Sequence, residues 1–157
     1  MKFQFINIGK PHDEQLKTSI NDFTKRINNY NKTEWVIIAP LKNAASLSTN
    51  NLKESEAQAL LSKINEDDFL VLLDETGKQL TSVELANFIS KKSIQSTKSI
   101  IFLIGGAFGV SDAIKQRANF IWSLSKLVFP HMIVRLILAE QVYRACTILR
   151  NEKYHHV

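Results

Sequence analysis

Residues 102–112 read FLIGGAFGVSD, and this stretch gives the first indication of the fold of the chain. An apolar run ends in a pair of glycines, a third glycine follows at Gly109, and Ser111 stands where a helix would be capped. A strand, a glycine loop and a helix in this order are typical of nucleotide-binding proteins, because glycine lets the backbone approach a ligand closely. The same glycines would suit a tight strand-to-helix turn that binds nothing. The stretch alone leaves both interpretations open.

The spacing of the glycines excludes the common phosphate-binding loops. The dinucleotide fingerprint is G-x-G-x-x-G with an acid at the end of the next strand. Here the order is GGAFG at residues 105–109, and no Asp or Glu lies between Asp112 and Glu140. A P-loop requires Ser or Thr after Gly-Lys, and the Gly-Lys pairs at residues 9–10 and 77–78 are followed by neither. A ligand of this loop would therefore be one that needs no phosphate cradle.

Strands and helices are predicted to alternate along the rest of the chain. Apolar runs rich in β-branched and aromatic residues predict strands over residues 2–8, 34–39, 68–74, 99–106 and 120–125. Helical spacing predicts helices over residues 12–30, 51–64, 81–92 and 130–150, and a short one after Ser111. Capping boxes are expected at Asn51 with Glu54 and at Thr81 with Glu84. Strands that are apolar without alternation are buried on both faces, so we expect an α/β fold: one domain over residues 1–157, with helices on both faces of a parallel sheet.

Composition and charge narrow the class of protein. The chain has 157 residues, 45% hydrophobic and 22% charged, and no apolar run approaches the roughly 20 residues of a membrane span. The lone Cys146 permits no internal disulfide and favours a reducing, cytoplasmic setting. The net charge of +5 divides into −1 for residues 1–80 and +6 for residues 81–157. The excess lies in the half with the glycine loop, which suits either a polyanionic partner or simple solubility.

The last predicted helix is apolar on nearly every side. Between Met132 and Leu149 the apolar residues cover almost the whole circumference of the helix, and such a helix must be buried on all sides. A terminal helix in a domain of this size has little of its own chain left to cover its outer face. We therefore predict a homodimer through this helix, the alternative being a helix enclosed within one subunit.

The polar residues of this helix form two pairs. His131 and Arg135 are four residues apart on one face, and Glu140 with Arg144 suggests an ion pair on the other. Arg135, among aliphatic residues, is expected to have a carboxylate or an RNA phosphate as its acceptor. The closing cluster of Tyr154, His155 and His156 is interpreted either as a frayed terminus or as a lid over a site.

Five segments together resemble a known family. GKQL after a strand, LIGGAFGVSD, WSLSKLVFPHMIVR, LAEQVYRA and NEKYHH occur in the order typical of the ribosomal large-subunit methyltransferase H family. This family belongs to the SPOUT class of RNA methyltransferases, and the resemblance runs the full length of the chain. It implies a parallel-sheet SPOUT fold with a C-terminal deep trefoil knot, a feature that residue spacing cannot show. It further implies a homodimer that uses S-adenosyl-L-methionine to methylate N3 of a pseudouridine in 23S rRNA of the assembled ribosome.

The resemblance also implies which residues form the site. It places the cofactor against Leu73, Gly105, Leu124, Ser125, Lys126, Leu127, Val128 and Phe129. The imide nitrogen must lose its proton during transfer, so a base or a stabiliser of negative charge is expected among His131, Arg135, Glu140, Tyr154 and His155. No metal and no membrane are expected. Phe108 departs from the small or charged residues usual at this place in the family, and is expected to alter the rim of the pocket.

Two other functions remain open on the sequence. The same cofactor site would serve a methyltransferase whose substrate is another RNA, such as tRNA. A non-enzymatic ribosome-binding factor would keep the fold, but it would have no need of the glycine loop or of the WSLSKLVF segment.

Overall fold

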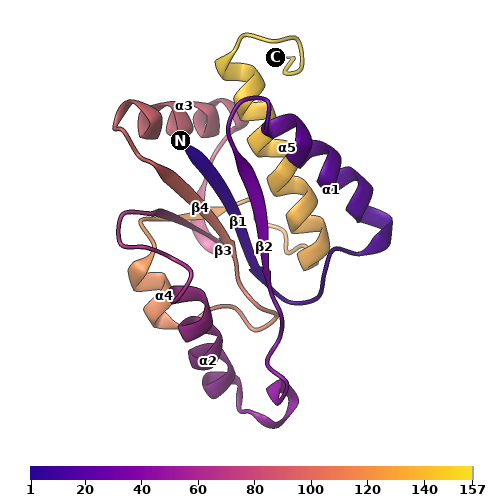
Figure 1. Cartoon of the computed structure of the whole chain (residues 1–157), viewed down its shortest axis with the longest axis vertical. Helices are drawn as coiled ribbons and strands as arrows, with labels where there is room; N and C mark the ends of the chain where they lie inside the picture. The colour runs from indigo at the N-terminus through magenta and orange to yellow at the C-terminus, as the bar shows by residue number, and fades with distance from the viewer. Residues whose placement is uncertain (157) are drawn as a thin grey trace.

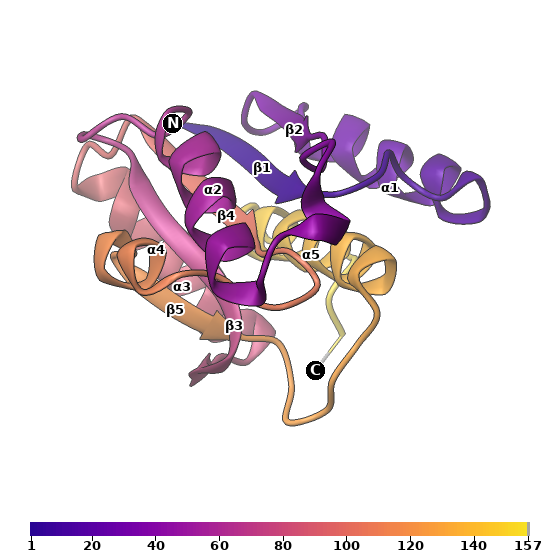
Figure 2. The ribbon, with the colours of Figure 1, turned by 90° about the horizontal axis from the view of Figure 1, so that it is seen from below.

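A parallel five-stranded sheet forms the centre of the protein, which is described from a computed structural model covering residues 1–156. The strands lie in the order β2-β1-β4-β3-β5, and every neighbouring pair is parallel (Figures 1 and 2). Their bounds are β1 Lys2–Ile8, β2 Thr33–Ile38, β3 Phe69–Gln79, β4 Ser99–Ile104 and β5 Phe120–Ser123. The predicted parallel sheet is confirmed.

Helices cover both faces of the sheet, as predicted (Figures 1 and 2). The helices α1, α3 and α5 pack on one face, and α2 and α4 pack on the other. Their bounds are α1 Glu14–Ile27, α2 Thr49–Leu61, α3 Ser82–Ile94, α4 Asp112–Arg117 and α5 His131–Leu149, with a short 3₁₀ turn at Ala44–Ser46. Two hydrophobic cores result, one on each side of the sheet.

The unbroken apolar character of β4 follows from this layering. Ile100, Phe102 and Ile104 point into the core beneath α1, α3 and α5, whereas Ile101 and Leu103 point into the core beneath α2 and α4. Successive side chains of a strand alternate between faces, so a strand covered on both sides needs apolar residues at every position. All six residues of β4 are buried.

The helix starts confirm some of the expected caps and correct others. Thr81 and Glu84 form the predicted capping box at α3. The box at Asn51 is wrong: α2 begins at Thr49, and the hydroxyl of Ser48 accepts the Asn51 amide at 3.3 Å. Ser48 caps the amide three residues ahead, so the helix starts earlier than the first apolar residue suggested. The last helix, α5, begins at His131, one residue later than expected, and Pro130 is its N-cap.

The third strand is longer than the sequence indicated. We expected a strand that stops at residue 74 and a turn that ends at Gly77, but β3 continues to Gln79. Leu73 and Lys78 both lie opposite Trp122 of β5, so residues 74–77 form a bulge between two paired segments. A β-carbon on Gly77 would lie 2.6 Å from the backbone carbonyl of Ile121. Because glycine has no side chain, the backbone at Gly77 can lie against β5, and β3 pairs with β5 again after the bulge.

The outer face of α5 remains partly uncovered in one copy of the chain. Leu138, Ala139, Val142 and Ala145 are fully buried against the core, with α1 and α3 alongside. The opposite side has Ile133, Leu136, Ile137, Glu140 and Arg144 by helical spacing, and Ile133 is 36% exposed. The prediction that a second copy covers this face stays a prediction.

Candidate active site

A cavity of about 530 Å³ lies at the carboxyl ends of β3, β4 and β5. Three segments form its walls: residues 73–76 at the β3 bulge, residues 104–110 around the glycine loop, and the end of β5 with the loop that follows it, residues 122–129 without Lys126. Lys53 of α2, Lys115 of α4, and His131 and Val134 of α5 complete the lining. The carboxyl edge of a parallel sheet is where open α/β folds bind their ligands, and this volume suits a small-molecule site.

The structure brings seven of the eight predicted cofactor residues to this cavity: Leu73, Gly105, Leu124, Ser125, Leu127, Val128 and Phe129. The eighth, Lys126, lines a separate hollow with Gln79, Thr81 and Glu84. The chain bends at Leu124, Lys126 and Leu127, and the Leu127 amide donates to the Ser125 hydroxyl at 3.0 Å across Lys126. Phe108 stands at the rim of the cavity with 60% of its surface exposed, in the position where we expected it to alter the rim.

The glycine loop is both a tight turn and a wall of the cavity. The Gly109 amide donates to the Gly106 carbonyl at 3.1 Å, and Gly109 has a φ of +80° that disfavours other residues. A β-carbon on Gly105 would lie 2.6 Å from the Val110 side chain. The two interpretations of residues 105–109 are therefore compatible, because the turn is what creates the cavity wall.

Sequence reasoning missed an acid in this cavity. The dinucleotide fingerprint places a ribose-binding acid on the strand after the glycine loop, where this chain has none, but Asp74 of the β3 bulge lines the cavity instead. The sequence DETG at residues 74–77, at the end of an apolar strand, is the signal that could have indicated an acid at this edge of the sheet. The sequence does not show that Asp74 lies near the glycine loop, because β3 precedes this loop by about thirty residues and adjoins β4 only in the folded sheet.

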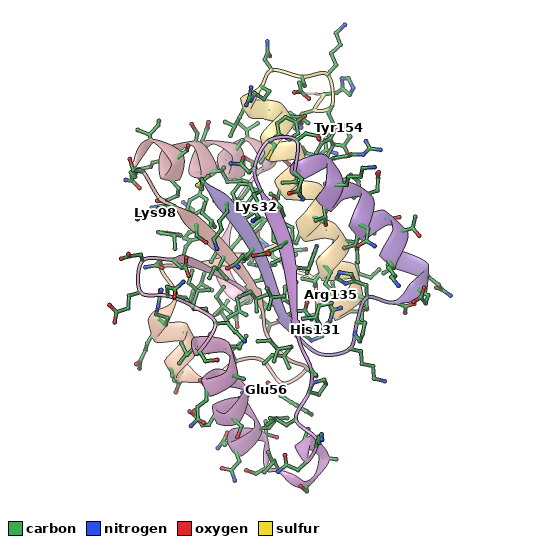
Figure 3. All side chains as sticks on the ribbon, viewed as in Figure 1. Lys32, Glu56, Lys98, His131, Arg135 and Tyr154 are labelled. Carbon is green, nitrogen blue, oxygen red and sulfur yellow. The ribbon has the colours of Figure 1, made fainter. Side chains whose placement is uncertain are left out.

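Arg135 is held inside the protein, one helical turn from His131. It is 2% exposed; its Nη1 donates to the Lys10 carbonyl at 3.0 Å and lies 3.3 Å from His12 Nδ1. The acceptor within the chain is thus a backbone carbonyl and not the predicted carboxylate. Burial lowers the pKa of Arg135. This arginine fastens the loop after β1 to the first turns of α5, where His131 lines the cavity (Figure 3).

The two histidines beside Arg135 should make the protein less stable in mild acid. Burial, and then the Arg135 charge, lower the pKa of both His12 and His131, with Lys17 adding to the effect at His12. The unfolded chain takes up protons at these rings before the folded protein does, so the free energy of unfolding should fall as the pH drops below about 6.5. Urea unfolding at pH 7.5, 6.5 and 5.5 measures this. The double variant His12→Gln/His131→Gln should lose part of the slope, and an unchanged slope would contradict the assignment.

Glu140, Arg144 and Tyr154 form a second polar cluster, with His155 beside it. Arg144 Nε donates to Glu140 Oε1 at 2.9 Å, which confirms the predicted ion pair, and the Tyr154 hydroxyl donates to the same oxygen at 3.1 Å. The guanidinium of Arg144 lies over the Tyr154 ring at 4.7 Å, and its Nη1 is 3.5 Å from His155 Nδ1. Burial, and then the bond to Glu140, raise the pKa of Tyr154, so its hydroxyl stays protonated.

The five predicted catalytic residues therefore lie in two groups within one copy of the chain. His131 and Arg135 are at the first turns of α5, whereas Tyr154 lies beyond its far end (Figure 3). The Tyr154 hydroxyl reaches back to Glu140, which lies nine residues, or about 14 Å, along α5 from His131, and neither Tyr154 nor Glu140 lines the cavity. The expectation that the tail covers a site is consequently not met at the cavity of the same subunit.

The tail packs back on the protein from Glu152 to His155. Tyr154 contacts the Tyr143 ring edge-on with centroids 4.7 Å apart, and the Tyr30 hydroxyl donates to Glu152 at 2.5 Å. These contacts argue against a frayed terminus for residues 152–155.

Neither a metal site nor a membrane helix is found in residues 1–156. No group of three or more His, Cys, Asp or Glu side chains in this range is arranged to hold a metal ion. No helix within the same range is long and apolar enough to cross a membrane.

The fold is that of the SPOUT class of methyltransferases. A family model described as a predicted SPOUT methyltransferase matches residues 1–155, nearly the whole chain. A probable methylase family protein from Haemophilus influenzae Rd KW20 shares the fold, with a TM-score of 0.55 at 11% identity. The similarity covers 99% of this chain and 70% of that one.

Closer relatives define the family more narrowly. The ribosomal RNA large subunit methyltransferase H of Cytophaga hutchinsonii is 44% identical over 156 residues, which cover 99% of this chain and 100% of that protein. The protein of the same name from Bacillus pumilus is 41% identical over 158 residues, covering 99% of each chain. The chain belongs to the ribosomal RNA large subunit methyltransferase H family.

Proposed function

We propose that this protein transfers a methyl group from S-adenosyl-L-methionine to N3 of a pseudouridine in the 23S rRNA of the assembled ribosome, in the cytoplasm. The observation that supports this most directly is the cavity at the carboxyl edge of the sheet. Seven of the residues that the family resemblance assigns to the cofactor line it together, although they come from three distant segments of the chain. The names of the relatives at 41–44% identity support ribosomal RNA as the substrate.

The cavity suits a methionine nucleoside better than a nucleotide. Leu73 and the loop after β5, from Leu124 to Phe129 without Lys126, offer apolar surface and backbone groups for an adenine. Gly105 admits close approach of the amino-acid end. No phosphate cradle is present at residues 105–109 or after the two Gly-Lys pairs. The cofactor supplies a methyl group on a sulfonium, and the chain has to hold this methyl in line with the substrate nitrogen.

The second group of catalytic candidates reaches a cavity if two copies pack through α5. We propose an antiparallel pair, centred on Ile133, Leu136 and Ile137 of the outer face. A parallel pair would bring Glu140 against Glu140 and Arg144 against Arg144, which is unfavourable for like charges. The antiparallel arrangement instead carries the Glu140–Arg144 cluster of one copy toward the first turn of the partner's α5, where the partner's cavity lies. Each site would then combine one copy's cavity with the other copy's tail.

Such a composite site has the groups that the chemistry requires. The imide N–H of the substrate must give up its proton, and Glu140, His155 and the neutral ring of His131 are acceptors for it. Arg144 stabilises the negative charge that develops on the base, while Tyr154 donates a hydrogen bond through its protonated hydroxyl. The surplus positive charge of residues 81–157 attracts the RNA backbone without reading its sequence. Recognition of one nucleotide then depends on the shape of the ribosomal surface.

A charge on the outer face of α5 should separate the dimer. Ile137→Glu would bury an unpaired carboxylate between two apolar surfaces, and the dimer dissociation constant should rise by about 100-fold or more. Analytical ultracentrifugation measures this. Ile94→Glu is the matched control, because Ile94 is 81% exposed at the end of α3 and should tolerate the charge. A dimer equally stable in both variants would show that the interface lies elsewhere.

The proposed activity is tested by methyl transfer from labelled S-adenosyl-L-methionine to ribosomes that lack this modification, with the labelled nucleotide mapped. We expect label at N3 of one pseudouridine of the large-subunit RNA, and poor transfer to naked RNA. Label on tRNA instead would support the same chemistry on another substrate. Failure to bind S-adenosylhomocysteine would favour a non-enzymatic ribosome-binding factor.

A further inference from the structure

The bulge of β3 presents an acidic side chain to the cavity. Leu73 and Lys78 both pair opposite Trp122, so the four residues between them have no partners in the sheet. Three of these four, Asp74, Glu75 and Thr76, line the cavity. Bulges next to binding sites commonly re-aim side chains, and this one interrupts β3 at the carboxyl edge, where the ligand is expected.

The carboxylate of Asp74 is fixed by one oxygen and free at the other. Oδ1 accepts the Thr76 amide at 2.9 Å and the Thr76 hydroxyl at 2.5 Å. Oδ2 is 3.9 Å from Lys115 Nζ, which is close enough for attraction and too far for a hydrogen bond. The side chain is only 15% exposed. An ionised carboxylate has about four acceptor sites, so Oδ2 retains unused ones in a largely enclosed position.

We propose that Asp74 is a cofactor-binding residue whose free oxygen accepts hydrogen bonds from the ribose hydroxyls of S-adenosyl-L-methionine. This inference rests on the proposed function. Asp74 directly follows Leu73, which is expected to cover the adenine, and the ribose is the next group along the cofactor. The vicinal hydroxyls of a ribose are paired O–H donors that one carboxylate can accept. Asp74 of β3 would thus bind the ribose hydroxyls, as an acid on the strand after the glycine loop does in a dinucleotide-binding fold.

The charges around Asp74 favour a neutral donor over a cation. Lys115 already balances the carboxylate, so a cationic group of the ligand would compete with a protein cation for the same oxygen. Burial acts to raise the pKa of Asp74, but the two bonds from Thr76 and the Lys115 charge outweigh it and leave the pKa below its ordinary value. The carboxylate therefore stays ionised at neutral pH and can only accept hydrogen bonds.

The substitution Asp74→Asn tests this with little change in shape. Its amide oxygen can still accept the two bonds from Thr76, while the free acceptor becomes an NH₂ donor. Isothermal titration calorimetry should show about 10- to 100-fold weaker binding of S-adenosylhomocysteine, the range for losing a hydrogen bond to a charged group. Binding of 5′-methylthioadenosine, which has the nucleoside without the amino-acid end, should weaken by the same factor. Asp67→Asn, an exposed change at the opposite end of β3, is the matched control and should leave both affinities unchanged.

A second measurement uses the unmodified protein and does not depend on how the variant folds. Adenosine should displace S-adenosylhomocysteine at least about 10-fold better than 2′,3′-dideoxyadenosine does, since the latter lacks both hydroxyls. Equal displacement by the two nucleosides would overturn the assignment. So would a loss in Asp74→Asn that is confined to S-adenosylhomocysteine, because the carboxylate would then recognise the amino-acid end. If the unmodified protein binds none of these compounds, the proposed cofactor itself is wrong, which separates that failure from the others.

Discussion

Deletion of residues 153–157 is expected to abolish methylation of ribosomes while leaving the fold and the affinity for S-adenosylhomocysteine close to normal. Tyr154 and His155 are lost with this segment, and both belong to the cluster around Glu140 and Arg144. No residue of that cluster lines the cavity in the same copy, and Glu140 lies about 14 Å along α5 from His131, so cofactor binding does not depend on the cluster. Circular dichroism, calorimetry and labelled methyl transfer measure the three properties separately. Normal turnover by the truncated protein would remove the tail from the mechanism.

Mixing two inactive variants should restore activity if the tail serves the partner's cavity. The second variant is Leu73→Trp, in which the larger side chain fills the cavity. In mixed dimers, the cavity of the truncated copy meets the intact tail of the Leu73→Trp copy. Random exchange makes half of the dimers mixed, each with one of two sites intact, so about a quarter of the normal activity should return. Mixed dimers that form but remain inactive would place the tail and cavity of each site in the same subunit.

Gly77→Ala should strongly destabilise the protein. Its β-carbon would lie 2.6 Å from the carbonyl carbon and oxygen of Ile121 and 2.7 Å from the amide of Trp122. These are backbone atoms of a paired strand, so they cannot move aside as a side chain can. We expect a loss of about 3 kcal/mol in the free energy of unfolding, at the upper end of ordinary overpacking. Cofactor affinity should fall with it, because the bulge that Gly77 closes forms one wall of the cavity.

Gly106→Ala is the control for this steric argument. Its β-carbon would approach an equally short 2.7 Å, but to the carboxylate oxygen of Glu56, which is the end of a flexible side chain on α2. That side chain can rotate away, so the stability should change by about 1 kcal/mol or less. Urea unfolding of both variants compares them directly. Equal losses, or no loss in Gly77→Ala, would contradict the proposed close contact with β5.

The regular elements were predictable because their signals are local. Alternation or continuity of apolar residues marked all five strands, and the parallel sheet with helices on both faces followed from strands such as β4 that are apolar at every position. The capping box at Thr81 was recognisable because its two partners are three residues apart. The glycine spacing differs from that of the common phosphate-binding loops, and this local signal directed the prediction to another kind of ligand. These inferences need no knowledge of which segments meet in space.

What the sequence by itself determined is therefore the class of fold, the loops that line the cavity and, through five motifs in order, the family. The tertiary structure alone decided that β3 resumes after a bulge, that Asp74 enters the cavity, and that Arg135 binds a backbone carbonyl. Each of these outcomes depends on contacts between residues tens of positions apart. Local periodicity specifies which face a residue takes, whereas packing of the whole chain specifies what that face meets.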